Sequence, residues 1–482
     1  MTRLATDIGK GLAAVRDARA IRPGERIHVL GAAGAGASAA VLLAHRAGAR
    51  VSGCDPGGQS PYTNALAEAG IPLVWEHAAQ HVLCDGHIED RPQRLAVTKA
   101  LTAINPDHHE LVAAHDLGIP TEPWQQLIAD AAATTRQRLV AVAGTHGKST
   151  TTGWLIDLLV RAGRDPSAFA GALLDEQLIG GPPSTARWGS GPEFVVEADE
   201  YAGNFDAYRP SVALLLNAEW DHPDVFADED AVFVAFERWL RNAQPDATLV
   251  ANLRDRGVAT IVERLRPDWS GTIVAADDEP ASYQIGLPGP ANAANAMAVV
   301  AAGRVLGIDE SIVRESLSAF RGVGRRLELK GEIGGIVVLD DYGHHPTAIA
   351  RTLEAVRGMY PDRPVWAVYE PLTYHRTALM LDRFADTLAT ADHVAIADIW
   401  AGRDPDTTIT SAQALADAVS ARAGSSGTAG TAVAPGTVEQ TADYLADNAR
   451  PGEVVLVMGG GRSYVIAARL VELLRGRTGG SA

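Results

Sequence analysis

One stretch of this sequence combines residue types that bind phosphate. An apolar run at 139–143 is followed by Gly144-Thr-His-Gly-Lys-Ser149 and then by a helix-forming stretch that begins at Thr150. A strand, a glycine-containing loop and a helix N-terminus form a cradle of backbone N–H groups that favours anions. Lys148 adds positive charge for β- and γ-phosphates, and the hydroxyl of Ser149 or Thr150 can hold Mg²⁺. The loop has Val142 where the standard pattern has its first glycine, but its context predicts nucleotide binding.

Acidic residues and a histidine follow two further apolar runs. Glu197-Ala-Asp-Glu200 lies at the end of the predicted strand at 194–198, and a second group follows the predicted strand at 212–216. This second group consists of Asn217, Glu219, Asp221 and His222. The carboxyl ends of parallel strands meet at one edge of an open α/β sheet. Carboxylates and imidazole there suit a magnesium ion, whereas a loop hydrogen bond between Asp221 and His222 is the alternative.

Polar residues beyond a third set of strands could recognise an amino acid. Asp340 and Asp341 follow the predicted strand 336–339 and could accept hydrogen bonds from an ammonium group. His344 and His345 could contact an anion at the start of the next helix, or Asp341 or Thr347 could simply cap that helix.

Three arginines are candidates for binding anions. Arg376 follows the predicted strand 365–369 and is a carboxylate-binding candidate. Arg325 and Arg326 are adjacent at a predicted hinge, where such a pair is usually solvated. Near an ATP site, however, arginine can bind phosphate through two parallel hydrogen bonds.

A second glycine-rich turn lies near the start of the chain. Gly31-Ala-Ala-Gly-Ala-Gly36 follows a predicted strand at 26–30, and a helix at 38–47 and a strand at 50–54 lead to Asp55. This βαβ pattern indicates a nucleotide site. Its glycine spacing is Gly-x-x-Gly-x-Gly rather than Gly-x-Gly-x-x-Gly, which argues against a nicotinamide cofactor. A tight turn with close helix–strand packing is the structural alternative.

The elements that must position these residues alternate between strand and helix. Further strands are predicted at 393–397 and 454–458, so the pattern predicts α/β domains whose mostly parallel sheets have helices on both faces. Residues 422–436 are rich in Gly, Ala, Ser and Thr and are predicted to be a flexible surface loop. The leading segment, residues 1–24, is predicted to form a short amphipathic surface helix.

Composition excludes several functional classes. The 482 residues are too many for one hydrophobic core, and the net charge of −17 argues against a general nucleic-acid binder. No apolar run reaches the length of a membrane span, and the leading segment lacks the pattern of a secretory signal. Two cysteines cannot build a disulfide framework, so a reducing, cytoplasmic compartment is expected.

Taken in order, the motifs resemble the Mur ligase family, the ATP-dependent amide-forming enzymes of peptidoglycan precursor synthesis. The resemblance covers roughly residues 25–475. The motifs that carry it are Gly144–Thr152, Glu197–Glu200, Glu219-x-Asp221-His222, Asn292-x-x-Asn295, Gly322-Val-x-Arg325-Arg326, Asp340–Pro346 and Tyr374-x-Arg376-Thr377. Within the family they are most similar to the branch that adds L-alanine.

The resemblance implies three domains. These are a Rossmann-like UDP-sugar domain at 1–137, a central P-loop-type ATPase domain at 138–322 and a Rossmann-like amino-acid domain at 323–482. The implied reaction joins L-alanine to the lactyl carboxylate of UDP-N-acetylmuramate through an acyl phosphate, with ATP and Mg²⁺. The expected protein is a monomer or homodimer that acts on small molecules and binds neither nucleic acid nor membrane.

The resemblance, with the residue patterns above, also assigns site residues. The predicted catalytic residues are Lys148, Glu200, His222, His345 and Arg376. The predicted ATP-binding residues are Gly144, Thr145, His146, Gly147, Lys148, Ser149, Thr150, Asn292, Asn295 and Arg325. The predicted substrate-binding residues are Gly31, Gly34, Gly36, Ser38, Asp55, Arg326, Asp341, His344 and Arg376. The predicted metal ligands are Ser149, Glu200 and His222.

The chain departs from the family pattern mainly in its two substrate sites. Ala33 replaces a glycine of the first turn, Ala291 replaces a histidine, and Tyr369-Glu-Pro-Leu372 replaces a typical Phe-Gln-Pro-His. These changes leave open a ligase for a different amino acid, carboxylate or peptide, including a recycling tripeptide ligase. A non-catalytic nucleotide-binding protein and a nicotinamide-dependent oxidoreductase are further alternatives.

Overall fold

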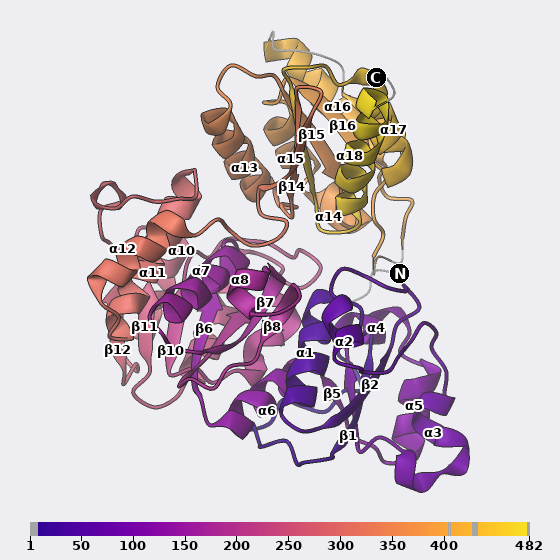
Figure 1. The fold of residues 1–482 in the computed structure, drawn as a ribbon, viewed down its shortest axis with the longest axis vertical. Coiled ribbons are helices and arrows are strands. Elements are labelled where there is room, and N and C mark those ends of the chain that lie inside the picture. Colours follow the sequence, from indigo (N-terminus) through magenta and orange to yellow (C-terminus); the bar gives the residue numbers. More distant parts are fainter. Residues whose placement is uncertain (1–7, 403, 405, 427–431, 480–482) are drawn as a thin grey trace. The chain divides into compact units, whose positions relative to one another are not determined.

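The computed structural model describes residues 8–402, 404, 406–426 and 432–479, and the chain divides into two compact units. Unit 1 takes in Met1–Asp221, Val225–Gly286 and Ala294–Val323. Unit 2 takes in His222–Asp224, Leu287–Ala293 and Gly324–Ala482. Unit 1 contains two sheets and unit 2 contains one, each flanked by helices (Figure 1). The predicted three-domain α/β fold, with mostly parallel sheets, is confirmed.

The first sheet of unit 1 is parallel throughout, in the order β3-β2-β1-β4-β5. Its strands are β1 (Arg26–Leu30), β2 (Arg50–Cys54), β3 (Leu73–Val74), β4 (Arg94–Val97) and β5 (Thr121–Pro123). Its helices are α1 (Ala35–Arg46), α2 (Asn64–Glu68), α3 (Gln80–Leu83), α4 (Lys99–Ile104), α5 (His109–Asp116) and α6 (Gln125–Thr135). Because β1 ends beside β2, the Gly-rich turn lies next to Asp55.

The second sheet of unit 1 has the order β12-β11-β10-β6-β9-β7-β8 and is parallel except for the β7–β8 pair. Its strands are β6 (Arg138–Ala143), β7 (Ser167–Leu174), β8 (Ser184–Arg187), β9 (Glu193–Ala198), β10 (Val212–Leu215), β11 (Thr248–Ala251) and β12 (Thr272–Ala275). Its longer helices are α7 (Lys148–Arg161), α9 (Glu229–Arg241), α10 (Arg256–Leu265), α11 (Pro290–Val305) and α12 (Glu310–Ala319). The short helix α8 (Glu176–Ile179) also belongs here. Since β6 pairs with both β9 and β10, the segments that follow these three strands share one sheet edge.

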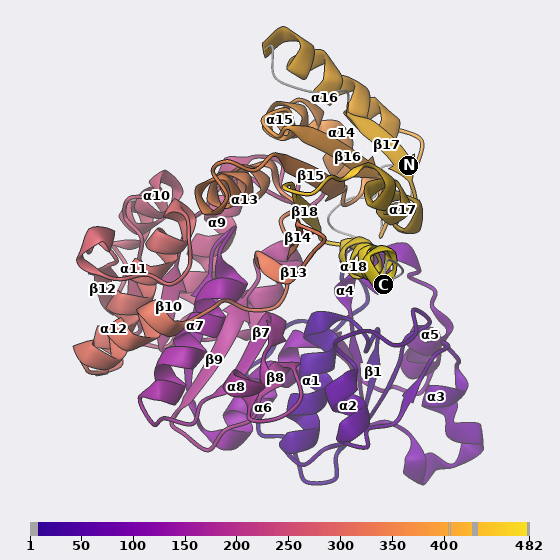
Figure 2. The ribbon, with the colours of Figure 1, turned by 45° about the horizontal axis from the view of Figure 1, so that its top comes forward.

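Helix α1 joins the two sheets of unit 1. It packs against α6 of its own sheet and against β7 and β8 of the second sheet, and both ribbon views show it beside β8 (Figures 1 and 2). The Thr185 hydroxyl of β8 donates to the carbonyl of Ala35 at 2.8 Å. Ser38 is buried at this contact, with its hydroxyl 3.3 Å from that of Thr185.

Unit 2 contains a six-stranded sheet in the order β13-β14-β18-β15-β16-β17. Its strands are β13 (Glu328–Ile333), β14 (Ile336–Asp341), β15 (Val365–Glu370), β16 (His393–Ala397), β17 (Val433–Gly436) and β18 (Val454–Gly459), with β13 antiparallel to β14. Its helices are α13 (Pro346–Met359), α14 (Tyr374–Leu379), α15 (Leu381–Leu388), α16 (Ala412–Ser426), α17 (Val438–Asn448) and α18 (Ser463–Gly479). The adjacent strands β14, β18 and β15 therefore deliver Asp341, Gly459 and Glu370 to one edge.

The helix predicted for the leading segment is wrong over residues 8–24, which form turns and extended chain. Residues 1–7 of that prediction lie outside the described residues. Long-range partners hold the segment instead: Arg16 lies 2.7 Å from Asp130, and the Ile21 N–H donates to the Thr134 hydroxyl at 2.8 Å. These contacts with α6 give polar groups of the segment hydrogen-bond partners that a helix would otherwise provide.

Two other element predictions are wrong. The predicted loop at 422–436 contains the end of α16 and all of β17, which pairs with β16, while residues 427–431 lie outside the described part of the chain. Asp340 and Asp341 do not follow β14 but are its last two residues, paired with Val457 and Met458 of β18. Among the described helices, none combines the length and apolar character needed to cross a bilayer.

Candidate active site

The predicted phosphate loop connects β6 to α7. Gly144 and Gly147 have φ values of +146° and +81°, which favour glycine, and α7 begins at Lys148 rather than at Thr150. Asn217, just beyond β10, holds the loop from the side. Its Oδ1 accepts from the His146 N–H at 2.8 Å and its Nδ2 donates to the His146 carbonyl at 3.0 Å. Asn217, which the sequence grouped with the acidic residues after this strand, therefore shapes the loop.

A second pair of contacts fixes the loop to the segment after β10. The Thr145 hydroxyl accepts from the Glu219 N–H at 3.0 Å and lies 3.2 Å from the Glu219 carbonyl. His146 Nε2 lies 2.5 Å from the Glu219 carboxylate. Strand pairing of β6 with β10 makes both contacts possible, because it brings the two carboxyl-terminal segments side by side.

Lys148 lies at the centre of a buried group of acceptors. Its Nζ donates to Glu200 Oε2 at 2.8 Å and to the Gly144 carbonyl at 2.7 Å, and lies 3.8 Å from an Asp199 oxygen. Burial lowers the pKa of Lys148, but the carboxylates of Glu200 and Asp199 outweigh it and hold the pKa above its ordinary value. The lysine therefore keeps its positive charge inside the loop, where a phosphate would meet it.

Ser149 faces a carboxylate that the predicted site set left out. The Ser149 hydroxyl donates to Glu197 Oε1 at 3.1 Å, and Glu197 Oε2 accepts from the Gly171 N–H of β7 at 2.6 Å. Both side chains are buried. Glu197 lies inside β9, so its position in an apolar strand was the available sequence signal: a carboxylate is seldom buried there without a role.

Asn295 of α11 packs over the phosphate loop. A Cβ placed on Gly147 would lie 2.5 Å from Asn295 Oδ1 and 3.0 Å from its Nδ2, so the amide occupies the space that a side chain would need. The structure thus brings Asn295 to the loop, as the shared motif suggested. Asn292 belongs to unit 2, where its Nδ2 donates to the Pro288 carbonyl at 2.8 Å.

The Gly-rich turn between β1 and α1 is held by residues at the end of β2. Gly31 has a φ of +79° and its N–H donates to the Cys54 carbonyl at 2.9 Å. Asp55 accepts from the Ala33 N–H at 3.0 Å. The structure brings Gly31, Gly34 and Asp55 to this turn. Gly36 and Ser38 face the interior, because a Cβ on Gly36 would lie 2.2 Å from the Trp124 ring and Ser38 is buried against Thr185.

In unit 2, Arg325 is tied to its own sheet. Its Nε lies 3.2 Å from Asp340 Oδ2, and its Nη2 donates to the Gly459 carbonyl and to the Ser463 hydroxyl at 2.8 and 2.7 Å. Arg326 lies over the Tyr342 ring, 5.0 Å from its centre. The arginine pair is thus not a solvated surface pair: Arg325 joins β14 to the start of α18.

The segment after β14 is organised by its own side chains. Asp341 accepts from the Gly343 N–H at 2.7 Å and from the Leu327 N–H at 2.9 Å. His345, rather than Asp341 or Thr347, caps α13, since its Nδ1 accepts from the Thr347 N–H at 3.2 Å. His344 Nδ1 lies 3.0 Å from the Tyr342 carbonyl.

Two further groups lie on the edge of unit 2. Arg376 of α14 is buried and its Nη2 donates to His222 Nδ1 at 2.9 Å. Glu370 at the end of β15 is also buried, which raises its pKa to about 7, and its Oε2 lacks a hydrogen-bond partner among the described residues. The sequence marked this position only as a departure from Gln, although a charge in place of an amide was the usable signal.

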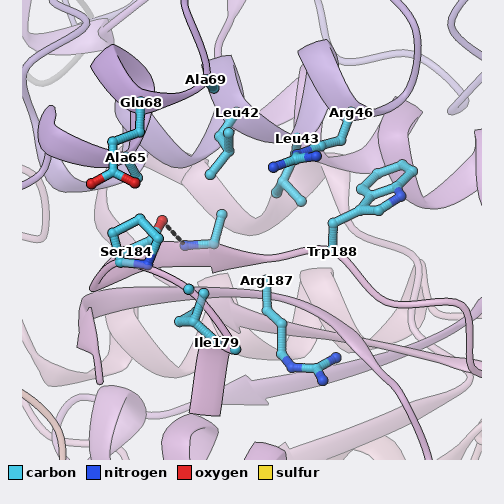
Figure 3. A pocket seen from close by; sticks show the side chains of 14 residues that line it. Leu42, Leu43, Arg46, Ala65, Glu68, Ala69, Ile179, Ser184, Arg187 and Trp188 are labelled. Atoms are coloured by element: carbon cyan, nitrogen blue, oxygen red, sulfur yellow. Dashed lines mark hydrogen bonds between the residues drawn. The ribbon is translucent and has the colours of Figure 1, made fainter. Parts of the chain in front are cut away.

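A cavity of about 300 Å³ lies at the α1–β8 contact and is separate from these groups (Figure 3). It is lined by α1 residues such as Leu42 and Arg46, by Glu68 of α2, and by Arg187 and Trp188 at the end of β8. None of the predicted site residues lines it.

Comparison with known proteins finds relatives along most of the chain. Three family models match: the Mur ligase family catalytic domain at residues 26–136, the Mur ligase middle domain at 142–283 and the Mur ligase glutamate ligase domain at 325–461. A UDP-N-acetylmuramate–L-alanine ligase of Roseiflexus sp. (strain RS-1) is 33% identical, with 93% of this chain and 99% of the relative covered. A protein of the same name from Kineococcus radiotolerans is 37% identical, with 94% and 97% covered.

Solved structures agree on the fold. The crystal structure of UDP-N-acetylmuramate-alanine ligase from Thermotoga maritima matches with a TM-score of 0.75 at 23% identity and covers 94% of this chain and 99% of its own. Because both curated relatives match over nearly their full length and the three family models together match most of the chain, the protein belongs to the Mur ligase family, the ATP-dependent ligases that form amide bonds.

Proposed function

We propose that this protein is an ATP- and Mg²⁺-dependent cytoplasmic enzyme that joins L-alanine to the lactyl carboxylate of UDP-N-acetylmuramate. The full-length relatives at 33% and 37% identity carry the name of that activity. The observation that carries the proposal is the geometry of the loop before α7, where Lys148 Nζ donates to Glu200 Oε2 at 2.8 Å. The tripeptide alternative has no comparable support among these relatives.

The residues around the loop fit a magnesium ion. The Ser149 hydroxyl and the Glu197 and Glu200 carboxylates are hard oxygen donors, and all three side chains are buried at the same sheet edge. We infer that Ser149 and Glu200 would hold the ion. His222, the third residue predicted as a ligand, belongs to unit 2. When bound, Mg²⁺ neutralises negative charge on the phosphates.

The protein's own groups suit phosphoryl transfer. A carboxylate oxygen of the lactyl group attacks the γ-phosphorus of ATP, the bond to the β–γ bridging oxygen breaks, and ADP leaves from an acyl phosphate. Lys148 faces the transferred group with a permanent positive charge, and the N–H groups of the loop bind the phosphate oxygens. Asn217 and Glu219 keep the loop in position for this role.

The second step forms the amide. The amino nitrogen of L-alanine attacks the acyl carbon, phosphate leaves, and the nitrogen loses a proton. In this proposal Arg376 binds the amino-acid carboxylate through parallel hydrogen bonds, and His345 and Asp341 lie on the same substrate side. Gly31, Gly34 and Asp55 would hold the UDP part at the first turn, where helix α1 presents its N-terminus.

Phosphate release from ATP and Mg²⁺ tests the proposal. UDP-N-acetylmuramate is supplied with single amino acids, or with the tripeptide, in parallel reactions. We expect release that requires both UDP-N-acetylmuramate and L-alanine. Lys148→Ala should reduce kcat by about 10²–10³-fold, as loss of a transition-state charge contact does. Lys10→Ala, at an exposed lysine, is the matched control and should retain wild-type turnover.

Two outcomes contradict the proposal. Turnover with the tripeptide but not with L-alanine would assign a peptide ligase. ATP hydrolysis that ignores UDP-N-acetylmuramate would remove the sugar assignment. Circular dichroism on Lys148→Ala checks that it folds, because it leaves Glu200 buried without its cation.

A further inference from the structure

A cluster of imidazole, thiol and carboxylate groups lies inside the first domain of unit 1, outside every predicted site residue. It gathers His28 of β1, Cys54 of β2, His81 of α3 and Glu110 of α5. One potential ligand atom from each lies within 4.8 Å of the others. His77 and His108 form a second such group with the same Glu110.

Four of the six separations between these groups are close to the edges of a tetrahedron around zinc. With zinc–nitrogen and zinc–sulfur bonds of about 2.1 and 2.3 Å, ligand atoms lie about 3.3 to 3.6 Å apart. His28 Nε2 is 3.4 Å from Cys54 Sγ and 3.3 Å from Glu110 Oε2. Cys54 Sγ and His81 Nδ1 each lie 3.4 Å from Glu110 Oε1. The remaining pairs lie within 4.8 Å, so all four groups are near enough to share one ion.

The second ring nitrogen of His28 already has a partner. His28 Nδ1 lies 2.8 Å from the Ser52 hydroxyl, so a proton on Nδ1 leaves the Nε2 lone pair directed at the cluster. Metal-binding histidines usually have such an outer partner, which fixes the tautomer and the ring orientation.

One ring nitrogen of the cluster and one of the neighbouring His77–His108–Glu110 group make no hydrogen bond in the described chain. His108 Nε2 and His81 Nδ1 are buried and lack a hydrogen-bond partner among the described residues, and His108 is only 3% exposed. A buried polar atom without a partner costs free energy, which coordination of a metal would remove for His81.

The charges suit a divalent, moderately soft cation. Cys54 and Glu110 are fully buried, and a thiolate with a carboxylate neutralises two positive charges. Sulfur and imidazole ligands favour zinc over magnesium, which prefers oxygen. A cavity of about 420 Å³ is lined by His81 of the cluster, with Ser52 and Cys84 among its other lining residues.

We propose that His28, Cys54, His81 and Glu110 bind a zinc ion with a structural role. The Cys54 carbonyl accepts hydrogen bonds from the N–H groups of Gly31 and Ala32, at 2.9 and 3.1 Å. An ion bound through the Cys54 thiolate therefore fixes the end of β2 and, through it, the Gly-rich turn. His77 is outside this group of four but adjoins it, with its Nδ1 3.2 Å from Cys54 Sγ.

Metal analysis of the full-length protein, after any affinity tag is removed, tests the site without using ligase activity. The protein is incubated with zinc in excess Mg²⁺, which fills oxygen sites, and dialysed. We expect about one zinc per chain, as for a closed four-ligand site. Cobalt in place of zinc should give the thiolate-to-metal absorption band of a sulfur-ligated ion.

Cys54→Ser should abolish that band and lower zinc affinity by at least about tenfold, whereas Cys84→Ser, at the other cysteine, should keep both. A chelator should lower the melting temperature of the wild type, and added zinc should restore it. Wild-type protein that retains no more zinc than Cys54→Ser, or binds cobalt without the thiolate band, would overturn the proposal and leave a hydrogen-bonded network. The wild-type readouts decide the matter even if the variant fails to fold.

Discussion

Replacing Gly147 with alanine tests whether the packing of α11 shapes the phosphate loop. The residue combines two constraints, a φ of +81° and an Asn295 amide that lies 2.5 Å from where a Cβ would stand. Gly163, just beyond α7, has a similar φ of +70°, but nothing lies within 4 Å of its Cβ position. Gly163→Ala is therefore a control that carries the backbone cost alone.

The two costs can be separated. An alanine in the left-handed region costs about 1–2 kcal/mol, and this applies to both positions. Forcing a methyl group into occupied space costs about 1–3 kcal/mol more, and this applies only at Gly147. Gly147→Ala should thus lower the free energy of unfolding by about 2–5 kcal/mol, against about 1–2 for Gly163→Ala.

Urea unfolding followed by tryptophan fluorescence measures these losses, and steady-state turnover measures the KM for ATP. We expect a raised KM for ATP only in Gly147→Ala, since Asn295 or the loop must move. Adding Asn295→Ala makes room for the methyl group, so the double variant should recover about 1–3 kcal/mol relative to additivity. Equal losses of unfolding free energy in the two alanine variants would refute this reasoning. Additive effects of Gly147→Ala and Asn295→Ala on that free energy would refute it as well.

Two other predictions concern the first domain. Gly36→Ala should lower the melting temperature measured by calorimetry, because its Cβ would lie 2.2 Å from the Trp124 ring, whereas Gly34→Ala, whose nearest contact is 3.7 Å away, should not. Burial raises the pKa of Glu25, but hydrogen bonds from Arg19 and from a backbone N–H outweigh it and lower the pKa from 4.5 to about 2. Between pH 4.5 and about 2, Glu25 therefore binds more protons in the unfolded chain than in the folded chain. The free energy of unfolding falls as the pH drops through that range. Glu25→Gln should show a shallower fall in unfolding free energy over the same pH range.

The strands and the phosphate loop could be predicted because their signals are local. Apolar runs bounded by Gly or charged residues gave β6, β9 and β10 nearly at their observed limits, and parallel pairing then fixed which loops share an edge. The leading segment could not be predicted in this way. Its hydrogen bonds go to Asp130 and Thr134, more than a hundred positions away, and no local pattern reveals such partners.

Side-chain partners were harder to predict than elements. His345 caps α13 although Asp341 and Thr347 were the more obvious capping types, because Asp341 lies within β14 and bonds to Leu327 and Gly343 instead. Asp341 pairs with Met458 of β18, which extends β14 by two residues beyond its predicted end. A sequence alone does not fix where such a strand ends. The roles assigned to the site residues stay predictions that the experiments above test.

The His–Cys–Glu cluster could not be predicted from the sequence either. Its ligands are spread from His28 to Glu110 and lack the short Cys-x-x-Cys spacing by which metal sites are usually found in sequences. Only the pairing of β1 with β2, together with α3 and α5, brings them into one place.

The turn between β1 and α1 accommodates one departure from the family pattern, at Ala33. Ala33 stands where the family has glycine, yet its φ is not among the positive values, so alanine carries no backbone strain there. Its N–H donates to Asp55, while Cys54 accepts from Gly31 and Ala32. Glycine is therefore required at Gly31, whose φ is +79°, but not at position 33, where Asp55 holds the turn. If zinc fixes Cys54, the ion and the turn are coupled. A chelator selective for zinc over Mg²⁺ should then raise the dissociation constant of UDP-N-acetylmuramate more than that of ATP.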